Sequence, residues 1–215
     1  MWQRPDAAQV AQMLTRYQEN VDTLVEWADP SWTGEFARMC GPHHRHAPQV
    51  IRAASRAVWG GASHRPLIEA FHSAGHGVAV LPSADLMRVT CGRALMLYRS
   101  AVRRCVDKPR RLMLRQWASA AVLTWVSSLK GDTPFDMRED LAQRGALALA
   151  WDGFCLLRAT GAWDDPALLR LMRFAFPRDW VEPAWLAGVA SAPGERDHSA
   201  MLMTRLSDFF PELSW

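Results

Sequence analysis

The sequence predicts an all-α protein, a compact helical domain of about eight or nine helices. Apolar residues recur at helical spacing along most of the 215 residues. Glycine and proline interrupt this pattern at intervals, as expected for loops between helices. Only one segment, residues 75–85, resembles a strand, and it is short. A composition of 49% hydrophobic and 22% charged residues is typical of a globular chain.

The first third of the chain predicts four helices. Apolar residues from Val10 to Val25 follow a helical period, and Pro30 disfavours helix in the residue before it. "CGPHHRHAP" (40–48) is a predicted loop, "WGGAS" (59–63) breaks the next helix, and Pro66 is suited to a first helical turn. The predicted helices cover residues 6–28, 32–40, 49–59 and 66–73.

The helical signal is strongest from Ser83 to Cys105. One side of this predicted helix is apolar, with Cys91, Leu95, Tyr98, Val102 and Cys105. The other side is polar, with Arg93, Arg99, Ser100, Arg103 and Arg104. Gly92 is expected either to bend the helix or to admit a close neighbour.

A corner, "VDKP" (106–109), precedes a second predicted helix over 109–129, and Asp107 is a plausible N-cap. From Trp117 onward this helix is apolar nearly all round, so we expect it to be centrally buried. "KGDTPFD" (130–136) and "APGERD" (192–197) are predicted breaks. Three further helices are predicted over residues 138–160, 166–176 and 198–209.

Residues 1–215 are expected to form a single helical domain, with a possible N-terminal lobe over 1–80 and a C-terminal helical core over 81–215. The longest stretch without a charged residue, Ala70 to Ala84, is fifteen residues, shorter than the about 20 that span a bilayer. Cys91 and Cys105 would lie about 21 Å apart on one helix and could not form a disulfide. We therefore expect a reduced, soluble, cytoplasmic protein.

Catalytic motifs are missing from the sequence. It contains no G-x-S-x-G, P-loop or G-x-G-x-x-G pattern. Acidic pairs such as Asp164 and Asp165 are adjacent, so they diverge on a helix. Cys40 has histidines nearby but no evident acid to orient them. We expect no catalytic residue and no cofactor.

A zinc site is an alternative hypothesis. Cys40 and His43, together with His72 and His76, have a spacing that four zinc ligands can adopt. Glycines 75 and 77 weaken the helix that would hold His72 and His76 on one face. A polar, histidine-rich loop explains His43–His46 more simply, so we expect no metal.

The segment "RRCVDKPRRLMLRQW" (103–117) concentrates positive charge at one helical corner. The segment has one acidic residue, Asp107, and six basic residues: Arg103, Arg104, Lys108, Arg110, Arg111 and Arg115. Three interpretations remain open: a solvated corner with internal ion pairs, contact with an acidic protein or lipid surface, and nucleic-acid binding. The next helix turns apolar after Arg115, which disfavours a DNA groove. Our hypothesis is that Arg103, Arg104, Arg110 and Arg111 help to dock a partner.

Three segments resemble a known family. "LMRVTCGRALMLYRSAVRRCVDKPRRLML" (86–114), "LAQRGALALAW" (141–151) and the C-terminal "LSDFFPEL" are similar to the SctK/YscK family of type III secretion sorting-platform accessory proteins. The resemblance covers roughly residues 80–215. The first third is divergent and resembles the Hrp-type branch of plant-associated bacteria.

The resemblance implies a non-enzymatic cytoplasmic adaptor at the inner-membrane base of the secretion apparatus. Such proteins link the cytoplasmic domain of the SctD-type inner-membrane ring protein to the SctQ-type pod protein. The pod protein in turn holds the stator and the ATPase. The family has no catalytic residues to transfer, and the resemblance does not identify the contact residues. Neither nucleic acid nor a membrane-spanning segment is expected.

Overall fold

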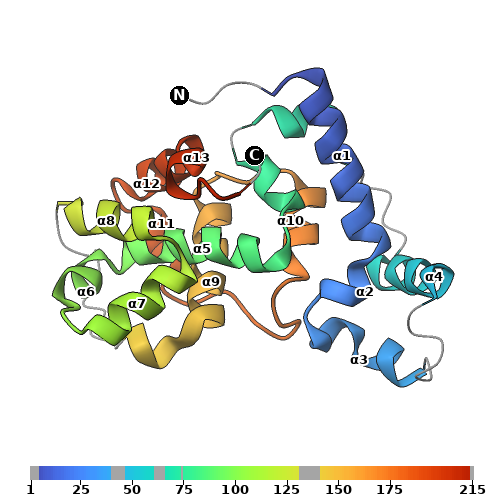
Figure 1. The fold of residues 1–215 in the computed structure, drawn as a ribbon, viewed down its shortest axis with the longest axis horizontal. Coiled ribbons are helices and arrows are strands. Elements are labelled where there is room, and N and C mark those ends of the chain that lie inside the picture. Colours follow the sequence, from blue (N-terminus) through green and yellow to red (C-terminus); the bar gives the residue numbers. More distant parts are fainter. Residues whose placement is uncertain (1–4, 40–46, 61–65, 74, 131–140, 214–215) are drawn as a thin grey trace. The chain divides into compact units, whose positions relative to one another are not determined.

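A computed structural model describes residues 5–39, 47–60, 66–73, 75–130 and 141–213 (Figure 1). It confirms the all-α class, because the regular structure within these residues is entirely helical. Nine of the described α-helices have seven residues or more. The predicted loop at 40–46 and most of the break after Lys130 lie outside the described residues. Among the described helices, none is long and apolar enough to cross a membrane.

The chain divides into two compact units. The carboxy-terminal unit contains Ala84–Asp164 and Glu182–Trp215, and the amino-terminal unit contains Gln3–Ser83 and Asp165–Val181. The amino-terminal unit thus includes a segment from late in the sequence. The predicted lobe and core, divided at residue 80, stay a prediction.

The amino-terminal unit is built around an amphipathic first helix. An Asp6–Gln9 capping box opens this helix, with Gln9 N donating to Asp6 Oδ1 at 2.8 Å and Asp6 N donating to Gln9 Oε1 at 2.9 Å. Tyr17 is buried and meets the Trp59 ring edge-on. The elements of this unit are α1 (Ala7–Asp22), α2 (Leu24–Trp27), α3 (Pro30–Met39), α4 (Pro48–Trp59), two 3₁₀ helices η1 (Ile68–His72) and η2 (His76–Val80), and α10 (Pro166–Arg173).

Long-range hydrogen bonds attach α10 and the residues after it to this unit. Asp29 N donates to Phe174 O at 2.8 Å, and Trp32 Nε1 donates to Phe176 O at 2.8 Å. Arg170 also donates to the carbonyl of Trp59 at the end of α4. The contribution of residues 165–181 could not be read from local periodicity, since these partners are more than a hundred positions away in sequence.

The strand-like prediction for residues 75–85 is wrong. Residues His76–Val80 form the 3₁₀ helix η2, which follows Gly75 in the left-handed conformation at φ 90°. Val78, Ala79 and Val80 are all buried, whereas a half-buried strand would bury alternate residues. The described residues contain no second strand for this segment to pair with. The predicted helix at 66–73 is likewise the shorter 3₁₀ helix η1.

The carboxy-terminal unit surrounds α5 (Ser83–Leu97), whose second half is buried on every side. The predicted polar side of this helix is therefore wrong at two positions, because Arg93 and Arg99 are also buried. The other elements of this unit are α6 (Arg99–Arg104), α7 (Lys108–Trp117), α8 (Ala120–Ser128), α9 (Leu141–Ala159), α11 (Leu186–Ala190), α12 (Glu195–Thr204) and α13 (Leu206–Phe209).

Two glycines permit close packing around α5. A Cβ at Gly153 of α9 would lie 1.8 Å from the carbonyl oxygen of Thr90. A Cβ at Gly92 would lie 3.3 Å from Cζ of Phe210, so Gly92 admits a close neighbour, one of the two predicted possibilities. The helix is instead interrupted at Tyr98.

Three predicted long helices are each divided. The helix over 6–28 breaks at Thr23, between α1 and α2. The helix over 83–105 breaks at Tyr98, where ψ is 22°. The helix over 109–129 breaks at Ala118, and Ser119 caps α8 by accepting a hydrogen bond from Val122 N at 3.0 Å. The prediction that this second half is centrally buried is wrong for one face, since Ala120, Thr124 and Ser128 are exposed.

The C-terminal prediction also needs correction. Helix α12 begins at Glu195, inside the predicted "APGERD" break, and Arg205 separates it from α13. Gly194 precedes α12 in the left-handed conformation at φ 86°, which explains the turn that the glycine and proline suggested. The short helix α11 was not predicted.

Candidate functional site

The basic corner consists of Arg103 and Arg104 at the end of α6 and Lys108, Arg110 and Arg111 at the start of α7. All five residues are exposed. Three residues, Cys105–Asp107, connect the two helices. Asp107 is the predicted N-cap, and its carboxylate accepts a hydrogen bond from Arg110 N at 3.2 Å. The cap fixes where α7 begins and thereby places Arg110 and Arg111 in its first turn.

Two of the four predicted arginines have partners within the protein. Arg103 Nη1 donates to the carbonyl of Leu129 at 2.8 Å, after the end of α8. Arg110 Nε lies 3.7 Å from Asp107 Oδ2, and both side chains are about half exposed. An exposed pair of this kind contributes little to stability. The structure thus supports part of the interpretation as a solvated corner with internal ion pairs.

Arg104 and Arg111 differ from these two. Within the part of the chain that the structure describes, neither side chain has a hydrogen-bond or ion-pair partner. Arg104 lies in the last turn of α6, where a cation is favourable, but Arg111 lies near the start of α7, where it is unfavourable. Local helix stability therefore does not account for the charge on Arg111.

Lys130 is a further basic residue near this corner in the chain. It is exposed, and it follows Leu129, whose carbonyl accepts the hydrogen bond from Arg103. Contacts between α6 and α8 and between α7 and α8 hold the three helices together, as Figure 1 shows. Lys130 was not among the predicted site residues, because the bond between Arg103 and Leu129 depends on this tertiary packing.

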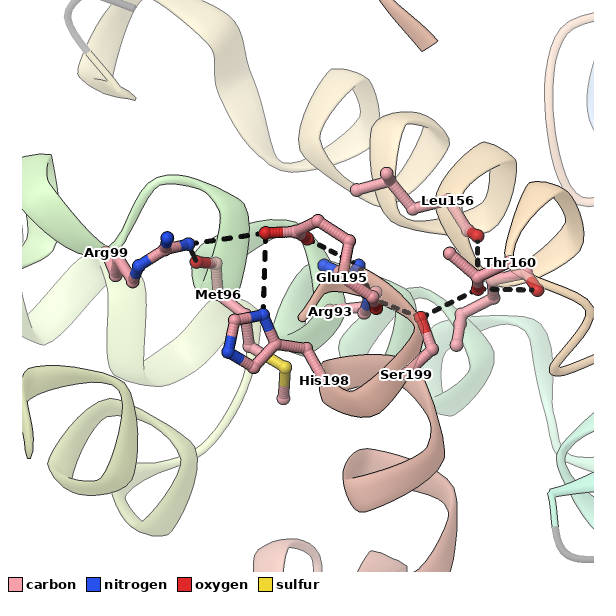
Figure 2. A network of polar contacts seen from close by, with 9 residues as sticks. Arg93, Met96, Arg99, Leu156, Thr160, Glu195, His198 and Ser199 are labelled. Carbon is pink, nitrogen blue, oxygen red and sulfur yellow. Dashed lines mark hydrogen bonds and ion pairs between the residues drawn. The ribbon is translucent and has the colours of Figure 1, made fainter. Parts of the chain in front are cut away.

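A buried ionic network connects α6 to α12 (Figure 2). Arg93 Nη2 donates to Glu195 Oε2 at 2.7 Å, and Arg93 Nε donates to Ser199 Oγ at 2.7 Å. Arg99 Nη1 lies 3.4 Å from the other carboxylate oxygen, Glu195 Oε1. Arg99 is the first residue of α6, so this pair connects the helix that carries Arg103 and Arg104 to α12.

Glu195 is held in its charged form. Burial acts to raise its pKa, but the nearby His198 ring, 3.4 Å away, and the hydrogen bond and charge of Arg93 outweigh burial, and the pKa is lowered to about 2. Burial lowers the pKa of Arg93, against the attraction of Glu195. The network is therefore an ion pair at neutral pH, and its role is structural.

A second buried cluster lies at the break between α5 and α6. Tyr98 Oη donates to Asp152 Oδ2 at 3.0 Å, and Arg144 donates to both the Tyr98 hydroxyl and the Asp152 carboxylate. Tyr98 lies between the end of α5 at Leu97 and the start of α6 at Arg99. The two clusters together support the orientation of α6, and periodicity alone did not reveal either of them.

The four residues of the alternative zinc hypothesis are only partly within the described residues. Cys40 and His43 lie outside them. His76 is buried, and its Nδ1 donates a hydrogen bond to the carbonyl oxygen of Ala70. His72 is half-buried. Among the described residues, histidine, cysteine and carboxylate side chains form no group of three suited to a metal ion.

Comparison with known proteins identifies a family. The model of a family described as "Bacterial type III secretion protein (HrpB4)" matches residues 6–212. No curated protein matches the chain, and no solved structure does.

Proposed function

The chain belongs to the HrpB4 family of bacterial type III secretion proteins, and we propose that it is a non-enzymatic adaptor of the secretion sorting platform. In this proposal it connects the cytoplasmic domain of the SctD-type ring protein to the SctQ-type pod protein. It works in the cytoplasm, peripherally at the inner-membrane base of the apparatus. The family match confirms the secretion assignment and extends over the divergent first third as well.

The exposed basic corner is the observation that supports partner binding most directly. It combines Lys108 with Arg104 and Arg111, whose side chains have no partner among the described residues, and buried ion pairs connect its helix α6 to α12. A rigid, charged surface favours fast and selective association with a surface of opposite charge. Arg103 and Arg110 contribute charge to the same corner, but part of their bonding capacity is used internally.

The test is the binding of purified protein to each purified partner, measured by calorimetry. A quadruple variant replaces all four arginines with glutamate: Arg103→Glu, Arg104→Glu, Arg110→Glu and Arg111→Glu. It is expected to weaken binding to at least one partner by about a hundredfold or more. A double variant, Arg104→Glu with Arg111→Glu, is expected to retain most of this effect, since these two side chains have no partner among the described residues. It also leaves the bond from Arg103 to the Leu129 carbonyl intact.

A charge control reverses two exposed arginines elsewhere in the same unit, Arg196 and Arg205, of which Arg205 pairs with Asp208 at the surface. This control changes the net charge by the same amount as the double variant. The proposal for the corner requires that the control binds nearly as well as wild type. If folded wild-type protein binds neither the ring protein nor the pod protein, the adaptor function is rejected.

A further inference from the structure

We propose that the outer face of α7 and the connection before it seat an acidic protein segment that inserts an apolar side chain beside Leu112. This inference rests on the proposed function and specifies the chemistry of the partner. It starts from two apolar residues within the basic corner. Val106, in the connection, is 89% exposed, and Leu112, on α7, is 56% exposed.

The helical geometry places Leu112 among cations. Leu114 is buried and marks the inner face of α7. Leu112 lies two positions earlier, about 200° away around the helix, and therefore faces outward. Its neighbours at i−4 and i+3 are Lys108 and Arg115, both exposed. The outer face of α7 is thus a leucine with basic residues on either side.

The charges of this face select the kind of partner. Between Arg103 and Arg115 there are six basic residues against the single carboxylate of Asp107, which already caps α7 and pairs with Arg110. An acidic segment complements the remaining positive charge. An apolar side chain from the same segment would remove Leu112 and Val106 from water, and such burial supplies affinity that salt does not screen.

A membrane or a nucleic acid fits this face less well. Binding at a lipid interface requires a broad apolar face, whereas here the outer side of α7 offers one leucine. Single-stranded nucleic acid binds on exposed aromatic rings. The exposed residues of α7 include no aromatic side chain. An acidic protein segment uses both the cations and the leucine.

The experiment measures binding to the purified ring-protein domain and pod protein at low and high salt. Leu112→Ala, made with Val106→Ser, is expected to weaken binding to one partner by about tenfold at both salt concentrations. Alanine at 112 maintains helix propensity. The matched control is Met201→Ala, which truncates another exposed apolar residue, on α12.

The outcomes distinguish this inference from the proposed function. If the arginine variants lose binding while the Leu112 and Val106 variant binds as wild type does, the apolar seat is rejected and the adaptor function stands. If neither partner binds wild type, both fail. Vesicles of equal parts phosphatidylglycerol and phosphatidylcholine are a further probe. Binding to them that is weakened by the same two substitutions, with partner binding unaffected, assigns the face to lipid and overturns the inference.

Discussion

Glu195 is the buried carboxylate that neutralises two buried arginines, Arg93 and Arg99. Its side chain is 1% exposed and contacts Arg93, Arg99 and His198. Removing one member of a buried ion pair leaves the other charge uncompensated and costs far more than removing an exposed pair. The surroundings of this residue therefore predict both the stability of the carboxy-terminal unit and its response to acid.

Glu195→Gln is expected to destabilise the protein by about 3–5 kcal/mol, because Arg93 loses its carboxylate partner in a dry environment. Urea unfolding followed by circular dichroism measures this change. The control is Asp208→Asn, which removes the exposed pair with Arg205 and is expected to cost about 0.5 kcal/mol or less. Equal effects of the two substitutions would contradict the structural role of the network.

Acid is expected to lower the free energy of unfolding of the wild type more than that of the Glu195→Gln variant. The pKa of Glu195 is lowered to about 2 from an ordinary 4.5, so the charged form stabilises the fold fully above about pH 5. This contribution, about 3 kcal/mol, is lost as the pH falls from 4.5 towards 2. Urea midpoints across this range should fall more steeply for wild type, and parallel slopes would refute the assignment.

Gly153→Ala is expected to destabilise the protein by about 3 kcal/mol, because the added Cβ would meet the Thr90 carbonyl at 1.8 Å. The backbone of α5 cannot turn aside as a flexible side chain can. Gly34→Ala in α3 is the control, since a Cβ there meets nothing within 4 Å, and it should be neutral or stabilising. Thermal unfolding of both variants decides, and an unaffected Gly153→Ala would disprove the close approach.

At the scale of elements, α8 shows how a helix can begin inside an apolar run. Ser119 accepts from Val122 N and donates to the carbonyl of Phe209 at 2.6 Å, so one hydroxyl both caps α8 and connects it to α13. The serine before the apolar residues was a visible capping signal in the sequence. The continuous apolar pattern on both sides of it led instead to one long predicted helix.

Ser119→Ala is expected to cost about 2 kcal/mol, since it removes a helix cap and leaves buried polar groups unsatisfied. The control is Thr124→Ala. Thr124 lies on the exposed face of the same helix, and its hydroxyl donates to the carbonyl of Ala120, one turn earlier. The threonine variant should unfold within about 0.5 kcal/mol of wild type. Similar losses in both variants would show that Ser119 has no special role.

Local signals predicted those elements whose determinants are local. The Asp107 cap, the end of α4 at Trp59 and the start of α10 at Pro166 follow from residues within a few positions, and they agree with the structure. The end of α10 at Arg173 comes three residues before the predicted one. The break at Tyr98 depends on Asp152 and Arg144, far along the chain, so no local pattern marks it. Arg93 was assigned to a polar side because periodicity does not reveal that Glu195 would meet it in the core.

The predicted site shows the same division. The helix ends that bring the four arginines to one corner could be derived from the sequence. Which of them have internal partners could not, because the Leu129 carbonyl approaches Arg103 only through the packing of α6 on α8. The buried network that supports α6 was missed for the same reason.

At the scale of the whole molecule, an adaptor needs a separate surface for each partner. The basic corner belongs to the carboxy-terminal unit, while the amino-terminal unit exposes the adjacent apolar residues Leu67 and Ile68. In the proposed adaptor, the basic corner and these apolar residues would belong to different units.

Size-exclusion chromatography with light scattering, on a mixture of this protein, the SctD-type cytoplasmic domain and the SctQ-type pod protein, tests the central claim most directly. The adaptor account predicts a three-component complex whose mass includes all three chains and which does not form when this protein is omitted. Partners that associate equally well without it, or that displace each other from it, would contradict the account.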